Sequence, residues 1–250
     1  MNQQAAGEQV SADLVRLFDR VASSPLANDC ATYFFVKRIL DLTLSLIALL
    51  VLSPLLVSIV LLILVETGWP AIFSQKRVGA RRYNCGGHSY WQPSMFTCYK
   101  FRSMVRDADP SVHKDFIRSF VEGHIEVSGN CGAQFKLNND VRVTRVGRIL
   151  RKTSLDELPQ LVNVVRGEMS LVGPRPDVLY SVELYEPWQY GRLAATPGIT
   201  GLWQIKGRSN VTFDHMVRMD IEYINNQSIS LDLKILLLTI PAVLSCRGAK

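Results

Sequence analysis

The chain has 250 residues, of which 48% are hydrophobic and 20% are charged, and this composition excludes an intrinsically disordered tail. Its formal net charge of +6 favours an anionic partner, such as a phosphorylated ligand, a lipid headgroup or nucleic acid, without choosing among them. The five cysteines are odd in number and lack the spacing of a secreted disulfide scaffold, so we expect reduced thiols in a cytosolic setting.

Residues 1–32 are expected to form an N-terminal extension with one weakly amphipathic stretch and no assigned chemistry. The first residues are polar and lack the basic head and apolar run of a cleaved leader, so no signal peptide is expected. Residues 33–66 are then expected to form a membrane helix, and residues 67–250 a cytoplasmic, membrane-associated domain.

An almost unbroken apolar run extends from Ile39 to Val65, long enough to cross a bilayer. Ser53 and Pro54 interrupt it near its middle, and the proline predicts a helix break there, with Ser53 satisfying a backbone carbonyl. Basic residues flank both ends, and such clusters prefer the cytoplasmic side, which favours a re-entrant helix. A kinked single span with its first basic pair outside the cell is the alternative. The flanking residues are Lys37, Arg38, Lys76, Arg77, Arg81 and Arg82.

The remaining chain predicts an α+β, helix-dominated fold with a small β element around residues 71–104. A short strand from residue 71 leads into a basic loop, residues 83–95 read as a surface loop, and residues 96–104 read as a strand. A helix is expected after Pro110, and another from Pro159 to Val165, ended by Gly167. Residues 231–246 are too interrupted to span a membrane and are expected to form an interfacial amphipathic helix.

Two adjacent carboxylates, Asp156 and Glu157, follow a strongly basic segment at residues 140–153. Such a pair beside arginines indicates a metal and phosphate site, in which one carboxylate attacks phosphorus. The spacing of Ser154 and Glu157 is also that of a capping box that starts a helix. Pro159 weakens this second interpretation, but both stay open on the local pattern.

Two further segments are typical of phosphate recognition. Pro174 and Pro176 restrict the backbone around Arg175, and a fixed guanidinium suits a phosphate, although the segment is equally a proline-bounded loop. Residues 196–208 combine three glycines with Arg208, which would allow a ligand close to the backbone. They match neither a P-loop nor a Rossmann fingerprint.

Cys85 and His88 have the spacing of zinc ligands, and Cys98 and Cys131 are further thiols that could complete such a site. No second closely spaced pair exists, so the sequence disfavours zinc. The other histidines, at positions 113, 124 and 215, are expected at the surface.

Taken in order, the blocks KRILDL, the Ser-Pro break, YKFRSM, RVTRVGRILRKTSLDELPQL, NVVRGEMSLVGPRP, PGITGLWQIKGR and DLKILLLT resemble the bacterial sugar transferase family of monotopic phosphoglycosyl transferases, in its minimal form. The resemblance covers residues 37–243. It implies a re-entrant membrane helix, a catalytic domain over residues 67–250, a UDP-sugar donor, a polyprenyl (undecaprenyl) phosphate acceptor and Mg²⁺. It further implies transfer of a sugar-1-phosphate through a covalent enzyme-phosphosugar intermediate, at the cytoplasmic face of the bacterial inner membrane, as the first step of exopolysaccharide, capsule or O-antigen synthesis.

Carried over by position, Asp156 resembles the nucleophile, and Glu157 its neighbour for metal and proton handling, with both as Mg²⁺ ligands. Four cations resemble phosphate or nucleotide contacts, and Ser53-Pro54 matches the helix break. The 83–95 segment is longer than expected for the family, and Val141 stands where a proline is usual. The four cations are Lys100, Arg151, Arg175 and Arg208.

Two other function classes are compatible with parts of the sequence. A non-catalytic anchor that binds anionic lipid explains the charge and the apolar run but leaves the carboxylate pair unexplained. Nucleic-acid binding by the basic segment is disfavoured by the apolar run, so no nucleic acid is expected among the partners. Membrane lipids are expected partners, and a homodimer is one option for the oligomeric state.

Overall fold

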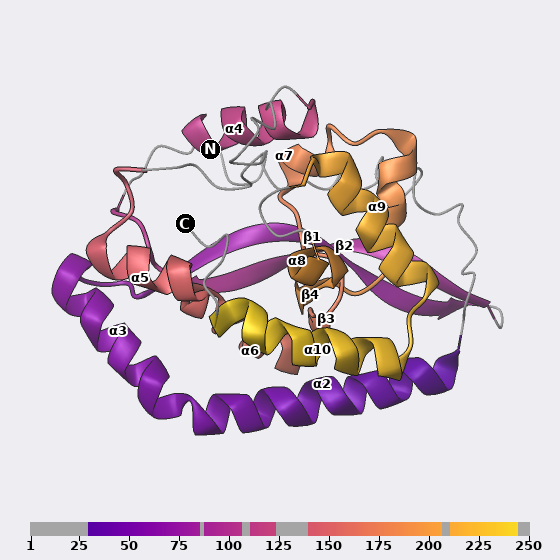
Figure 1. The fold of residues 1–250 in the computed structure, drawn as a ribbon, viewed down its shortest axis with the longest axis horizontal. Helices are drawn as coiled ribbons and strands as arrows, with labels where there is room; N and C mark the ends of the chain where they lie inside the picture. Colours follow the sequence, from indigo (N-terminus) through magenta and orange to yellow (C-terminus); the bar gives the residue numbers. More distant parts are fainter. Residues whose placement is uncertain (1–29, 86–87, 107–110, 124–139, 207–210, 245–250) are drawn as a thin grey trace, which may run out of the picture.

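The structure is a computed structural model that describes residues 30–85, 88–106, 111–123, 140–206 and 211–244 (Figure 1). It is dominated by helices with a small β component, as predicted. Most of the N-terminal extension, Arg208, Cys131 and His124 lie outside the described residues. The helices are α2 (Ala31–Val51), α3 (Ser53–Thr67), α4 (Ser111–Val121), α5 (Arg145–Thr153), η1 (Leu155–Glu157), α6 (Gln160–Val165), α7 (Leu179–Val182), η2 (Pro187–Leu193), α8 (Leu202–Lys206), α9 (Phe213–Asn225) and α10 (Ile229–Leu244).

The apolar run forms two helices, α2 and α3, that meet at Leu52 with a bend of 62°. Pro54 lies in the first turn of α3, where its missing N–H is tolerated. The Ser53 hydroxyl donates to the Leu50 carbonyl at 2.8 Å. The break predicted at Ser53-Pro54 is therefore confirmed. No single helix among the described residues is long and apolar enough to cross a bilayer, and α2 and α3 pass that test only as a bent pair, as a broken span or a re-entrant loop.

Both ends of the bent pair contact the same body of the protein. Along α2, Lys37, Asp41 and Ser45 are buried at intervals of four residues, which places them on one helix face, and α2 contacts α6 and α10. At the other end, the Glu66 carboxylate accepts from the backbone N–H groups of Arg145 and Val146 at 2.7 and 3.0 Å. Figure 1 shows α2 along the lower edge of the molecule, with α3 rising from its end toward α5.

The β component is mainly a long antiparallel hairpin of β1 (Ile72–Cys85) and β2 (His88–Phe101), paired from Ile72 with Phe101 to Cys85 with His88. The prediction of a surface loop at 83–95 was therefore wrong. Burial alternates there, since Trp91 and Pro93 are buried while Gln92 is exposed. This period of two is typical of a strand, and a proline is tolerated because both strands are edges of a two-stranded sheet.

A second, parallel pair of short strands joins β3 (Ser170–Val172) to β4 (Gly198–Thr200). A Cβ atom on Gly198 would lie 2.1 Å from the backbone nitrogen of Gly173, and one on Gly201 would lie 2.6 Å from the Gly173 carbonyl oxygen. These glycines were expected to admit a ligand. They instead allow two segments of this chain to approach each other.

The remaining predicted helices are confirmed. Helix α4 follows Pro110, α6 precedes Gly167, whose φ is 75°, and α10 covers most of the predicted C-terminal helix. The main hydrophobic core lies between the hairpin, α4, η2 and α9, around Val78, Phe213 and Val217. Helix α10 buries Ile235 and also exposes a row of apolar side chains, so apolar residues lie on more than one face of this helix. That row contains Leu233, Leu237, Leu238 and Ile240.

Candidate active site

The carboxylate pair lies on a one-turn connection between two helices. Ser154 ends α5 with a φ of 58°, in the left-handed region, and its side chain caps no helix. The residues Asp156 and Glu157 then occupy η1, and Pro159 is the N-cap of α6. The capping-box interpretation is wrong, because the Ser154 side chain makes no capping hydrogen bond and the Glu157 carboxylate accepts from Lys100 and Arg175 instead.

Glu157 is held by two cations from distant parts of the chain. Its Oε1 accepts from Lys100 Nζ on β2 at 2.8 Å and from Arg175 Nη2 at 2.6 Å, and its Oε2 accepts from Arg175 Nη1 at 3.3 Å. Burial alone would raise the pKa of Glu157, but attraction to Arg175 and Lys100 holds it well below its ordinary value. The carboxylate is therefore ionised at neutral pH, and both of its oxygens are engaged.

Arg175 is fixed from behind by a buried charge cluster that the sequence did not reveal. Arg192 donates to the Arg175 carbonyl at 3.2 Å and forms ion pairs with Asp177 at 3.0 Å and Asp220 at 2.8 Å. Tyr185 donates to Asp177 at 2.6 Å. Because the backbone of Arg175 is held here, its guanidinium is presented to Glu157 in a fixed position.

Asp156 lies within electrostatic reach of Arg151 and Arg175. Burial lowers the pKa of Arg151, while the negative charges of Asp156 and Asp140 oppose that shift. Burial lowers the pKa of Arg175, but the charge of Glu157, and to a smaller extent that of Asp156, raises it above its ordinary value. Arg151 Nε donates to the Ser103 hydroxyl at 2.9 Å. The structure thus brings together five of the predicted site residues: Lys100, Arg151, Asp156, Glu157 and Arg175. Ser53 and Pro54 lie apart from them at the helix break, and Arg208 lies outside the described residues.

Two residues near this cluster were not predicted as site residues. The buried guanidinium of Arg77 donates to the Pro176 carbonyl at 3.0 Å and to Gln75 at 2.8 Å, so it supports the same proline-bounded segment as Arg192. His113 was expected at the surface but is partly buried, with Nδ1 2.5 Å from the Tyr180 hydroxyl. Burial and the nearby arginines lower the pKa of His113 from 6.5 to about 4. It is therefore neutral at physiological pH.

The donor set limits where a metal ion could bind. Among the described residues, no group of three His, Cys, Asp or Glu side chains is placed to hold one. The zinc candidates gain no support, since Cys98 is buried, its pKa is raised by burial, and Cys131 is not described. Mg²⁺ often binds through one or two carboxylates together with substrate phosphates. Both oxygens of Glu157 accept from Lys100 or Arg175, so metal binding by Glu157 would require one of these contacts to be exchanged.

The fold and the site together define a class of protein. It is rich in helices, carries an exposed apolar helix pair, and places two adjacent carboxylates among arginines and a lysine, an arrangement suited to phosphoryl transfer. Residues 32–246 match the family described as bacterial sugar transferase. The chain belongs to this family, as its resemblance had indicated.

Curated relatives agree with this assignment. The chain is 44% identical to "Galactosyl transferase CpsE" of Streptococcus agalactiae, over 88% of this chain and 44% of that protein. It is 42% identical to "Exopolysaccharide production protein ExoY" of Rhizobium meliloti, over 85% of this chain and 87% of that protein. It is 40% identical to the "Undecaprenyl-phosphate galactose phosphotransferase" of Salmonella typhimurium, over 86% of this chain and 42% of that protein. The chain therefore spans nearly all of ExoY but less than half of the other two.

Proposed function

We propose that this protein transfers a sugar-1-phosphate from a UDP-sugar to polyprenyl phosphate. The observation that carries the proposal is the carboxylate pair, in which Glu157 is bound by Lys100 and Arg175 while Asp156 lies in the field of Arg151 and Arg175. Membership of the bacterial sugar transferase family supports the same chemistry. So does the name of the Salmonella relative, which specifies galactose phosphate transfer to undecaprenyl phosphate.

In the first step, an oxygen of the Asp156 carboxylate attacks the phosphorus that bears the sugar. A P–O bond to Asp156 forms, the P–O bond of the donor diphosphate breaks, and UMP leaves with the bonding electron pair. In the second step, an oxygen of polyprenyl phosphate attacks the same phosphorus and displaces the Asp156 carboxylate. The product is a polyprenyl diphosphate sugar, and the enzyme returns to its starting state.

The surrounding cations have separate roles in this scheme. Arg151 and Arg175 stabilise negative charge on the phosphoryl oxygens during both displacements. Lys100 and Arg175 keep Glu157 ionised and fixed beside Asp156. The negative charge of Glu157 in turn holds these two cations in place at the site. A bound Mg²⁺, with Asp156 and the donor phosphates as ligands, would supply further charge neutralisation.

We further propose that α2 and α3 form a re-entrant membrane hairpin and that the domain lies on the cytoplasmic face of the inner membrane. The support is geometric: the start of α2 is tied to α10 through Lys37 and Asp232 at 2.8 Å, and the end of α3 is tied to α5 through Glu66. Because both ends of this helix pair contact the same domain, the pair would enter and leave the membrane on the same side. Its exposed apolar face, which includes Leu46, Leu50 and Leu61, would lie in lipid.

The test is UMP release by the purified protein in nanodiscs with polyprenyl phosphate, Mg²⁺ and a panel of UDP-sugars. Asp156→Asn is expected to abolish release, and Asp115→Asn, which changes an exposed carboxylate on α4, is the matched control. Release with one donor, lost only in Asp156→Asn, supports the proposal and identifies the sugar. Full activity in a folded Asp156→Asn variant would overturn the assigned nucleophile.

A further inference from the structure

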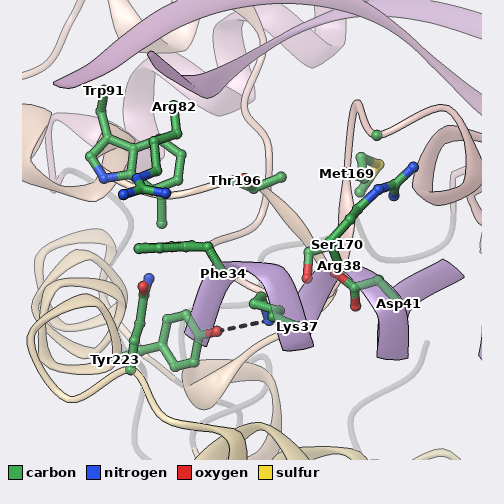
Figure 2. A pocket seen from close by; sticks show the side chains of 13 residues that line it. Phe34, Lys37, Arg38, Asp41, Arg82, Trp91, Met169, Ser170, Thr196 and Tyr223 are labelled. Atoms are coloured by element: carbon green, nitrogen blue, oxygen red, sulfur yellow. Dashed lines mark hydrogen bonds between the residues drawn. The ribbon is translucent and has the colours of Figure 1, made fainter. Parts of the chain in front are cut away.

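A cavity of about 360 Å³ lies at the start of α2 (Figure 2). Its walls are that helix, the part of the β1–β2 hairpin that carries Arg82 and Trp91, and the segment around Ser170. Trp91, in its wall, lies nine positions before Lys100 along β2, which corresponds to roughly 30 Å of strand. None of the proposed catalytic or phosphate-binding residues lines it. The cavity is therefore a separate place on the molecule, which the proposed transfer reaction does not use.

The lining carries an excess of positive charge. Lys37, Arg38 and Arg82 line the cavity, with Asp41 as a carboxylate among them. Lys37 is neutralised by Asp232 behind it. Arg38 instead donates to the carbonyls of Val164 and Val165, at 2.6 and 2.8 Å, and these oxygens carry no formal charge. Among the described residues the cavity thus retains a net positive charge, which favours an anionic ligand.

One wall holds a buried hydrogen-bond donor without an acceptor. The indole of Trp91 is only 7% exposed, and its Nε1 has no hydrogen-bond partner among the described residues. An indole N–H can only donate, and a buried donor without an acceptor is unfavourable. Figure 2 shows this indole beside the Arg82 guanidinium, which stacks 4.5 Å over the Phe34 ring. An oxyanion at this end would satisfy the Trp91 N–H next to a cation.

Apolar surface adjoins the cavity on α2. Phe35 and Ile39 each follow a lining residue of α2 in the sequence and are 67% and 46% exposed. They begin the exposed apolar face that continues along α2 and α3. A ligand with a phosphate in the cavity could therefore place hydrocarbon chains on this face, whereas a small soluble anion would leave it exposed to water.

We propose that this cavity binds the phosphate of an anionic phospholipid, such as phosphatidylglycerol, with the lipid chains on α2. The inference rests on the membrane association of α2 and α3 in the proposed function, but not on sugar transfer. Basic pockets at the cytoplasmic end of membrane helices are suited to anionic headgroups. The bound lipid would fix the start of α2 at the membrane surface.

The test is native mass spectrometry of the full-length protein released from phosphatidylcholine nanodiscs with and without phosphatidylglycerol. The wild type is expected to retain one phosphatidylglycerol and no phosphatidylcholine. Trp91→Phe keeps a ring against Phe34 but removes the donor, and Arg82→Gln removes a charge. Each is expected to weaken retention about three- to tenfold. Lys234→Gln, an equal change of charge on the exposed face of α10, is the control and should retain the lipid.

Equal retention of phosphatidylglycerol in wild type, Trp91→Phe and Arg82→Gln would overturn the proposal, as would equal retention of phosphatidylcholine. Thermal melting verifies that each variant is folded, and the conservative Trp91→Phe decides the result if Arg82→Gln is unstable. Soluble glycerol phosphate is added in a separate arm. Displacement of the lipid at comparable concentration would assign the cavity to a free phosphate instead. UMP release is measured separately, so a failed lipid result and a failed transferase result remain distinguishable.

Discussion

Arg175 binds Glu157 through both terminal nitrogens of its guanidinium, at 2.6 and 3.3 Å. This pair joins the proline-bounded segment after β3 to the turn that carries Asp156. Lys100 adds a third contact from β2, at 2.8 Å. The residue beside the proposed nucleophile is therefore fixed from two directions.

Arg175→Lys tests whether this two-point geometry matters beyond charge. Lysine keeps the positive charge but cannot bind a carboxylate through two parallel N–H groups. We expect kcat/KM for UMP release to fall on the order of 10²-fold because the site loses its fixed orientation. Arg218→Lys, on the exposed face of α9, is the matched control. Equal activity in both variants would show that only the charge at position 175 is required.

The buried Arg192 cluster predicts a large effect on stability. Arg192 is 2% exposed, and Arg192→Met leaves Asp177 and Asp220 without their cation. Loss of one partner from a buried ion pair costs about 3–5 kcal/mol in the free energy of unfolding. Thermal melting in detergent would measure this loss. The double variant Arg192→Met/Asp220→Asn should recover part of it, and a purely additive double variant would argue against the pair.

His113 predicts a dependence of stability on acid pH. Its pKa is about 4 in the folded protein and 6.5 as an unperturbed side chain. Between these pH values His113 is protonated in the unfolded chain but neutral in the folded protein. Its contribution therefore lowers the free energy of unfolding progressively as pH falls from 6.5 toward 4. His113→Gln should therefore show a smaller loss of melting temperature over that range. An identical pH profile in the variant would contradict the buried, neutral state of His113.

Glu66 predicts a local effect at the junction of α3 and α5. Its carboxylate caps two backbone N–H groups in the first turn of α5, at Arg145 and Val146. Glu66→Ala should weaken that end by about 0.5–2 kcal/mol. Hydrogen exchange is expected to accelerate at these amides and not in α9. Unchanged protection in α5, with Asp115→Ala as the control, would show that the cap contributes nothing.

The parts of the fold that depend on local chemistry were predictable from the sequence. Pro54 breaks the apolar helix because it lacks an N–H, and Gly167 follows α6 with a positive φ. The carboxylate pair was visible because two acidic residues directly follow a basic segment. In residues 83–95, the loop-like composition obscured the alternation of Trp91 and Pro93 with exposed neighbours.

The support for the site was not predictable because its contacts are distant in sequence. Arg192 pairs with Asp220, 28 positions away, and Lys100 meets Glu157 across 57 positions. No local pattern marks Arg192 or Asp220, since each alone resembles an ordinary surface charge. Lys100 was indicated only by the family resemblance, and as a phosphate contact, not as a partner of Glu157. Likewise, Gly198 resembled part of a ligand-binding loop until its contact with Gly173 was known.

The most direct test of the central claim is to detect the covalent intermediate on Asp156. The purified protein is mixed with its UDP-sugar and Mg²⁺ without polyprenyl phosphate, and intact mass and released UMP are measured together. We predict one phosphosugar added per active site, one UMP released for each, and loss of the adduct when polyprenyl phosphate is supplied. Asp156→Asn should form no adduct. UMP release that requires the acceptor, with no adduct at any time, would contradict the two-step mechanism.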